Sequence, residues 1–210
     1  MLKKFRVLLV IIALVVTLSL MNNTYSRYVA GSSSDVKIDF AKWQLLVNET
    51  DITNQSSSNI TFEPVIYPST NVAENKIAPS SSGYFDIEID PTNVDVSFKY
   101  TINLAIDESQ NIPDLIITKY AYIPENYIES DDEENKLKYV YLDNTSVITN
   151  EVSYSSEGFK PITIRIFFEW YEGENEIMDD TADTNVGLEA ATNDTKFTIN
   201  AQINFEQVIA

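Results

Sequence analysis

The chain has 210 residues and a large acidic excess, with 32 Asp and Glu against 14 Lys and Arg and a net charge of −18. Because this charge repels nucleic acids and anionic membrane surfaces, we expect no nucleic-acid partner. The chain contains no histidine, which removes the commonest general base and the commonest zinc ligand. It also contains no cysteine, so its stability must come from packing and strand pairing. No pair of carboxylates stands out as a hydrolytic site, and we therefore predict that the protein is not an enzyme.

The N-terminus has the pattern of a secretory signal. Lys3, Lys4 and Arg6 precede an apolar run at residues 7–21, and polar residues follow it. The run has 15 residues, fewer than the ~20 that a membrane-spanning helix needs. We predict that residues 1–26 are a signal peptide. The alternative is an uncleaved anchor, which would be the only contact of this chain with a membrane.

Small side chains mark the expected cleavage site. A signal peptidase binds its substrate in an extended form and accepts small residues at positions −3 and −1. Thr24 and Ser26 meet this requirement, so we expect cleavage after Ser26 and a mature chain that begins at Arg27. Cleavage after Ala30 is the alternative. Residues 27–210 are enough for one domain with a hydrophobic core.

Beyond the signal, nearly every apolar segment alternates with a period of two, which predicts half-buried strands. The longest alternation, at residues 94–106, predicts one long antiparallel strand. About eight strands are expected in all: 36–46, 60–66, 84–90, 94–106, 114–123, 137–142, 162–171 and 196–208. Turn residues separate them at 78–83, 90–93 and 155–158. The sequence therefore predicts an all-β, two-sheet antiparallel sandwich of jelly-roll-like or immunoglobulin-like type, and it leaves the strand order open.

Two acidic segments interrupt the strand pattern. Residues 124–135 are most simply a solvated loop. Residues 169–187 hold four Glu and three Asp, and a short helix is expected around 186–191. Carboxylate oxygens suit a hard cation, and calcium is the one expected outside a cell. Asp179, Asp180 and Asp183 are therefore candidate calcium ligands, with a solvated loop as the alternative; no other cofactor is expected.

Tyrosines recur at period two in two of the predicted strands. Together with Trp43 and Trp170, the pairs Tyr120 with Tyr122 and Tyr139 with Tyr141 have the chemistry of a sugar-stacking platform. Packing on the face of a sheet is the alternative explanation of the same spacing.

Three segments together resemble the camelysin/TasA family of exported proteins of Gram-positive bacteria. They are the signal with its exit at 24–28, the unit at 77–90 that leads into 96–102, and residues 180–187 followed by a closing strand that ends at 205–207. The resemblance implies a jelly-roll sandwich, processing by a dedicated signal peptidase and assembly into extracellular biofilm fibres. The peptidase activity described for camelysin is not carried over, because a zinc peptidase holds its metal chiefly through His and this chain has none.

We therefore expect a secreted structural subunit or accessory protein of an extracellular fibre, biofilm matrix or cell surface. Once the signal is cleaved, residues 27–34 would form a free tail leading into the alternating segment 36–40. Such a segment suits addition, as a strand, to an open sheet edge of another copy or of a related fibre subunit. The alternative is a monomeric surface-binding module for polysaccharide or protein.

Overall fold

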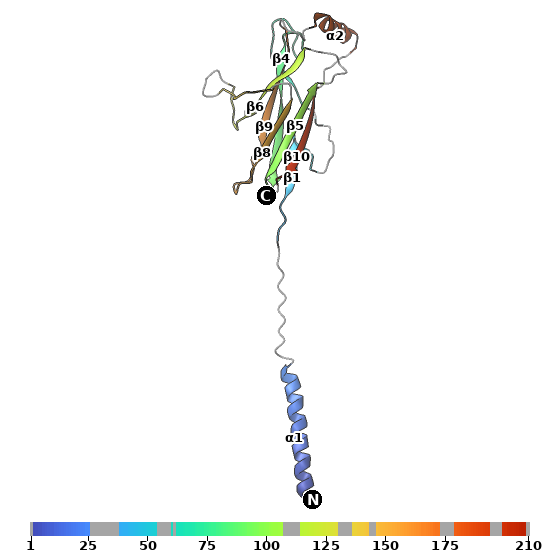
Figure 1. Ribbon diagram of the computed structural model, residues 1–210, viewed down its shortest axis with the longest axis vertical. Helices are drawn as coiled ribbons and strands as arrows, with labels where there is room; N and C mark the ends of the chain where they lie inside the picture. The colour runs from blue at the N-terminus through green and yellow to red at the C-terminus, as the bar shows by residue number, and fades with distance from the viewer. Residues whose placement is uncertain are drawn as a thin grey trace. The chain divides into compact units, whose positions relative to one another are not determined.

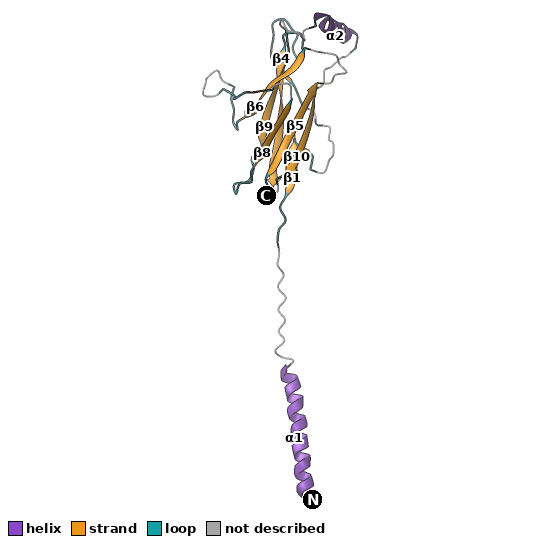
Figure 2. Ribbon diagram, viewed as in Figure 1, coloured by secondary structure: helices purple, strands orange, loops and turns teal. Residues whose placement is uncertain are grey.

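The structure is a computed structural model of the chain, and it describes residues 2–25, 38–53, 60, 62–106, 114–129, 136–142, 146–172, 179–193 and 199–208. Two compact units can be distinguished, Met1–Phe40 and Ala41–Ala210. The first contains helix α1 (Leu2–Tyr25), and the second contains helix α2 (Asp180–Thr192) and the described strands (Figures 1 and 2). The strands are β1 (Trp43–Val47), β2 (Thr50–Asp51), β3 (Val65–Ile66), β4 (Ser82–Val94), β5 (Phe98–Ile106), β6 (Leu115–Ile123), β7 (Val140–Tyr141), β8 (Val147–Val152), β9 (Ile162–Trp170) and β10 (Ile199–Gln207).

The strands form two antiparallel sheets, which confirms the predicted sandwich. The larger sheet has the order β2-β1-β4-β9-β6-β7, with β3 also paired to β4, and the smaller sheet has the order β10-β5-β8. The chain passes from one sheet to the other between β4 and β5, between β5 and β6, between β7 and β8, and again on each side of β9. This repeated crossing is the kind of connection that a jelly-roll-like sandwich uses.

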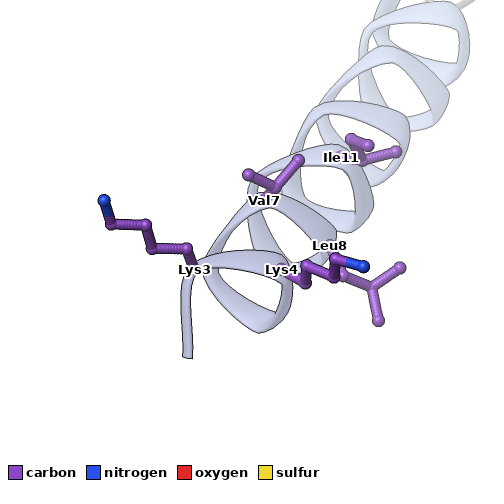
Figure 3. Close-up of a pocket in the computed structure, with 5 residues that line it drawn as sticks. All are labelled: Lys3, Lys4, Val7, Leu8 and Ile11. Atoms are coloured by element: carbon purple, nitrogen blue, oxygen red, sulfur yellow. The ribbon is translucent and has the colours of Figure 1, made fainter. Parts of the chain in front are cut away.

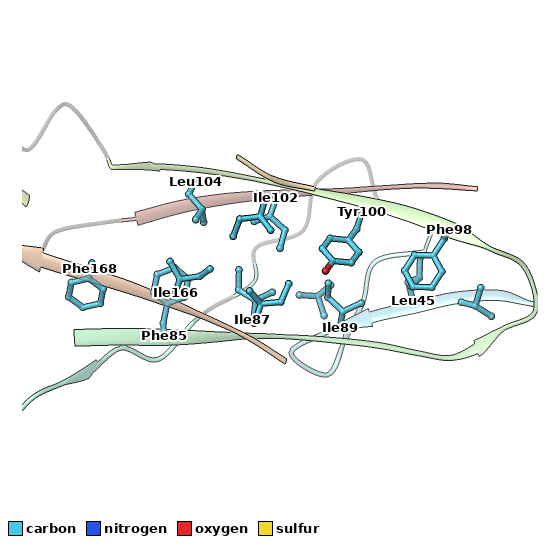
Figure 4. Close-up of a cluster of buried hydrophobic side chains, with 14 of the residues drawn as sticks. Leu45, Phe85, Ile87, Ile89, Phe98, Tyr100, Ile102, Leu104, Ile166 and Phe168 are labelled. Carbon is cyan, nitrogen blue, oxygen red and sulfur yellow. The ribbon is translucent and has the colours of Figure 1, made fainter. Parts of the chain in front are cut away.

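The core lies between the two sheets, where the period-two pattern places every second side chain. In β5, Tyr100 and Ile102 are fully buried and face Ile87 and Ile89 of β4 (Figure 4). Phe168 of β9 extends the same layer toward one end. Each fully buried aliphatic or aromatic side chain contributes about 1.5–3 kcal/mol. Without disulfides, this layer supplies the main stabilising term.

The predicted long strand at 94–106 is wrong in one respect, because it is divided between β4 and β5. Residues 95–97 turn the chain from one sheet to the other. The predicted turn at 90–93 is also wrong, since these residues lie inside β4. There the pairing with β1 shifts register, from Asn93 opposite Gln44 to Asp90 opposite Leu46. Two residues of β4, Pro91 and Thr92, thus lie opposite the single residue Leu45 of β1, and such a bulge is where a strand tolerates proline.

Strands β2 and β8 were not predicted, and other predicted strands are shorter in the structure. In β8 only Ile148 is fully buried, so its apolar alternation is weak. Residues 38–42 and 62–64, predicted as strand, are not in a strand. The helix expected around 186–191 is confirmed, and α2 extends it in both directions. The part of the predicted acidic loop that is described, 124–129, has neither helix nor strand.

Candidate functional site

The free edge of β10 is the first candidate site. Within the described part of the chain, β10 pairs only with β5, through nine consecutive residue pairs without a register shift. Ile203 and Phe205 lie on the core side, opposite the fully buried Ile102 and Tyr100. Yet the side chains of Ile203 and Phe205 are only half-buried. The core is therefore incompletely covered along this edge.

β10 also lacks the features with which proteins usually protect a sheet edge. Such edges tend to carry lysine, proline, an inward charge or a bulge. The sequence of β10, Ile-Asn-Ala-Gln-Ile-Asn-Phe-Glu-Gln, has no lysine and no proline, and its core-facing positions hold no charge. A long, regular and apolar edge of this kind is suited to pair with another strand.

A segment with the matching pattern lies directly before the sandwich. Ile38 is 78% exposed and Phe40 is 96% exposed, and Asp39 between them is exposed as well. Alternation of two large apolar side chains about a charged one is the pattern of a half-buried strand, but here neither apolar side chain is covered. Val36, which continues the pattern in the sequence, lies outside the described residues.

The acidic residues proposed as calcium ligands lie at the start of α2, at one end of the sandwich (Figure 1). Asp179 is the N-cap: its Oδ1 accepts hydrogen bonds from the backbone N–H groups of Thr181 and Ala182, each at 3.0 Å. Asp180 and Asp183 occupy the first turn, where negative charge is favoured by the helix dipole. The cap explains why the helix begins at this point in the sequence.

A buried carboxylate that the sequence analysis did not single out holds this cap in place. Asp114, fully buried directly before β6, accepts the backbone N–H of Asp179 on its Oδ2 at 2.8 Å. Its Oδ1 is buried without a hydrogen-bond partner. Asp183 Oδ1 accepts the indole Nε1–H of Trp170 at 2.9 Å, which ties α2 to the end of β9. Only the tertiary structure brings Asp114 to this helix, across 65 positions of the sequence.

These contacts give the acidic residues a structural role at the helix end. Among the residues that the structure describes, no group of three acidic side chains has the geometry to hold a metal ion. Asp179 and Asp183 each already use one oxygen for a protein donor. Residues 173–178, which include two further Glu of the acidic segment, lie outside the described residues. The calcium site therefore stays a prediction.

Asp183 makes stability depend on pH. Burial raises its pKa above the ordinary value of 3.8, the Trp170 hydrogen bond opposes this, and the nearby carboxylates of Asp114, Glu172 and Asp180 raise it further. With a raised pKa in the folded state, the contribution of this group is fully present below pH 3.8 and is lost as the pH rises through the folded pKa. We expect the melting temperature of Asp183→Asn, relative to that of the native chain, to rise between pH 3 and pH 7.

The asparagine keeps an oxygen for the Trp170 donor, so this comparison isolates the charge. Glu189→Gln, which removes a charge from an exposed position of the same helix that does not act on Asp183, is the matched control and should show no such rise. A pH-independent difference between Asp183→Asn and the native chain would contradict the assignment.

Helix α1 contains the apolar run of the predicted signal. Its large apolar side chains from Phe5 to Leu20 are each more than half exposed, and the hydroxyls of Thr17 and Ser19 donate to backbone carbonyls one turn earlier. In the described residues, no helix combines the length and apolar character required to cross a membrane. The hollow in Figure 3 is lined by Lys3, Lys4, Val7, Leu8 and Ile11. It lies along successive turns of one helix and encloses no ligand site.

The residues of the expected cleavage site are only partly described. Thr24 lies in the last turn of α1, while Ser26, Arg27 and Ala30 lie outside the described residues. Cleavage after Ser26 therefore stays a prediction.

The four tyrosines considered as one platform lie on two faces of the larger sheet. The hydroxyl of Tyr122 is 2.9 Å from that of the buried Tyr100, and the ring of Tyr120 packs edge-on against Tyr122. This pair therefore lies on the core side of the sheet, although Tyr122 is 38% exposed. Burial raises the pKa of both hydroxyls, which therefore stay protonated. Tyr139 and Tyr141 instead lie on the opposite face, where Lys119 contacts both rings. The ring of Tyr139 also packs against Phe167, whereas Tyr141 is 71% exposed.

Neither a scan of protein-family models nor a search of curated proteins finds a match to this chain.

Proposed function

We propose that the protein is an exported structural subunit of an extracellular fibre, cell surface or matrix, and that its subunits join by strand addition. In this proposal the signal is cut after Ser26, and the segment that contains Ile38 and Phe40 becomes the donor strand. It pairs with the free edge of β10 on a second copy or on a related fibre subunit. Because donor and acceptor lie on different parts of the molecule, the contact repeats head to tail without closing, and a filament results.

The exposure of Ile38 and Phe40 is the observation that carries this proposal. Two large apolar side chains, 78% and 96% exposed and separated by one residue, are not buried in the isolated chain. On the β10 edge they would continue the core-facing row that includes Ala201, Ile203 and Phe205. Burying them contributes about 1.5–3 kcal/mol each, in addition to the backbone hydrogen bonds of the new strand pair.

The proposal predicts that the double variant Ile38→Ser, Phe40→Ser folds normally but does not polymerise. Exposed side chains contribute within about 0.5 kcal/mol to folding, so the melting temperature should stay close to that of the native chain. Filaments seen by electron microscopy of the exported protein should disappear. The mature N-terminus should be verified by intact mass, with Arg27 as the first residue.

Asp39→Ser is the matched control, because it changes the same segment on the side that faces solvent in the added strand. It should leave the filaments intact. Native protein that stays monomeric would overturn the proposed function. Filaments of normal length from the double variant would overturn the assignment of the donor strand, but not the proposal that the protein is a fibre subunit.

A further inference from the structure

The outer face of the larger sheet, which points away from the sandwich core, carries a second apolar cluster. Phe167 lies between the core residues Ile166 and Phe168 in β9 and therefore points to this outer face. It is 6% exposed, and it packs with Ala121 and Leu137, which are also buried. An outer sheet face is normally polar, so this cluster marks a surface that differs from the rest of the sandwich.

Tyrosine rings extend this cluster into a row across several strands. Tyr67, which follows β3, packs against Tyr84 of β4 with ring centroids 5.7 Å apart. Tyr84 packs against Phe167 with ring centroids 6.0 Å apart, and Tyr139 packs against Phe167 at 5.4 Å. The middle of the row is covered, but Tyr67 is 38% exposed and Tyr139 is 42% exposed. Two aromatic surfaces thus remain open on a rigid base.

Charged groups hold these rings in fixed positions. Arg165 lies with its guanidinium carbon 3.8 Å from the ring centroid of Tyr84. Its Nε and Nη2 donate to the two carboxylate oxygens of Asp86, each at 2.8 Å, which fixes the guanidinium in a bidentate pair. Lys119 Nζ lies 4.0 Å from the ring centroid of Tyr139. These contacts restrict the side chains before any ligand arrives, which lowers the entropic cost of binding.

Cations lie directly at the rings of this surface, although the chain as a whole is acidic. Lys119 and Arg165 contact the tyrosine rings, Asp86 is paired to Arg165, and the anions Glu88 and Glu169 lie on the same face of the sheet. Burial and Glu129 raise the pKa of Tyr67, so its hydroxyl remains a hydrogen-bond donor at neutral pH. The surface thus offers aromatic faces, hydroxyls and one planar ion pair, without an excess of positive charge.

We propose that this aromatic platform, formed by Tyr67, Tyr84, Tyr139, Arg165 and Asp86, binds a neutral polysaccharide. The C–H face of a sugar ring packs on the open rings of Tyr67 and Tyr139, and neighbouring sugar hydroxyls bond to the Arg165–Asp86 pair. Of the five guanidinium N–H groups of Arg165, two bind Asp86 and three remain. A mainly aromatic site with a few fixed polar groups is the usual composition of a small-ligand site.

Charge selects a neutral polymer as the occupant. A polyanion would be repelled by the net charge of −18, and the platform offers no surplus of positive charge to compensate. A polycation would meet Arg165 and Lys119 at the rings themselves. The proposal does not depend on fibre formation, because the platform lies on the larger sheet and the β10 edge belongs to the smaller one.

Calorimetric titration of the full chain tests this proposal. The probes are neutral hexasaccharides of glucose, N-acetylglucosamine, mannose and galactose, with a galacturonate hexamer as the anionic comparison. We expect saturable binding of at least one neutral probe and about tenfold weaker binding of it by Tyr139→Ala, since an aromatic contact contributes up to about 1.5 kcal/mol beyond its buried area. Tyr154→Ala is the matched control, because Tyr154 is 53% exposed and packs on a single ring, that of Phe159.

Tyr67→Ala provides a second test at the other end of the row, and it decides the question if Tyr139→Ala does not fold. Both variants are compared with the native chain by their melting curves. Failure of every neutral probe, binding of the galacturonate hexamer alone, or unchanged affinity of the folded tyrosine variants would each overturn the proposal. Equal loss of affinity in Tyr154→Ala would do the same.

Discussion

Replacement of Gly83 by alanine is expected to destabilise the sandwich by about 1–3 kcal/mol, the usual cost of forcing extra atoms into a packed site. A Cβ atom at this position would lie 2.5 Å from the carbonyl oxygen of Val65 and 2.8 Å from the Phe168 ring. The backbone of β3 would have to move away from β4, although Ile66 and Tyr67 both depend on this pairing. Thermal or denaturant unfolding measures the loss.

Gly187→Ala is the matched control for this prediction. Gly187 lies inside α2, and a Cβ atom there would meet nothing within 4 Å. Alanine in an exposed helix stabilises by about 0.4–1 kcal/mol relative to glycine, so this variant should melt at a higher temperature than the native chain. If Gly83→Ala melted at the native temperature, the close approach of β3 to β4 would be wrong.

The sequence was sufficient to predict the strands whose two faces differ in polarity. In β5 the core-facing side chains from Phe98 to Leu104 are buried and alternate with half-buried polar ones, and the periodicity reports this directly. At residues 90–93 the sequence predicted a turn, and this was wrong. Residues such as Asp90 and Pro91 are common in turns, but they also occur at a bulge inside a strand, which is what the structure has here. Gly83 was likewise assigned to a turn, whereas the structure places it in β4, where β3 approaches closely.

The residues that the sequence did not reveal are those whose environment is set by distant parts of the chain. In the sequence, Asp114 is an ordinary acidic residue next to a strand. In the structure it accepts a hydrogen bond from the backbone N–H of Asp179, the N-cap of α2. Tyr67 is separated from Tyr139 by 72 positions, and the consecutive apolar residues 166–168 of β9 were the only local signal that both faces of that strand are covered. Period two cannot distinguish such a strand from a simple core strand.

Two variants that each lack one half of the proposed subunit contact should be unable to polymerise alone and should form a one-to-one complex when mixed. The first is the double variant Ile38→Ser, Phe40→Ser, which lacks a functional donor strand and retains the β10 edge. The second is Ala201→Lys, which retains the donor strand. Ala201 lies on the core side of β10, opposite Leu104, and is half-buried. An inward charge on an edge strand blocks the addition of a further strand.

The lysine should be tolerated in the folded subunit, because a long side chain at an edge extends its ammonium group to solvent. Ala201→Val is the matched control: it adds volume at the same position without charge and should still form filaments. The two polymerisation-deficient variants differ in what they retain, so only their mixture contains both a functional donor and a functional acceptor. Size-exclusion chromatography with light scattering should therefore show dimers in the mixture and monomers in each separate sample.

This experiment distinguishes head-to-tail addition from a symmetric contact between two β10 edges. A symmetric contact would require an intact β10 edge on both copies, so Ala201→Lys would not pair with the double variant Ile38→Ser, Phe40→Ser. The double variant, whose edge is intact, would form dimers by itself. Filaments from Ala201→Lys alone would show that the acceptor edge is not β10. Dimers that appear only in the mixture would require one donor segment and one acceptor edge per junction, which is the geometry that lets a chain of subunits grow without limit.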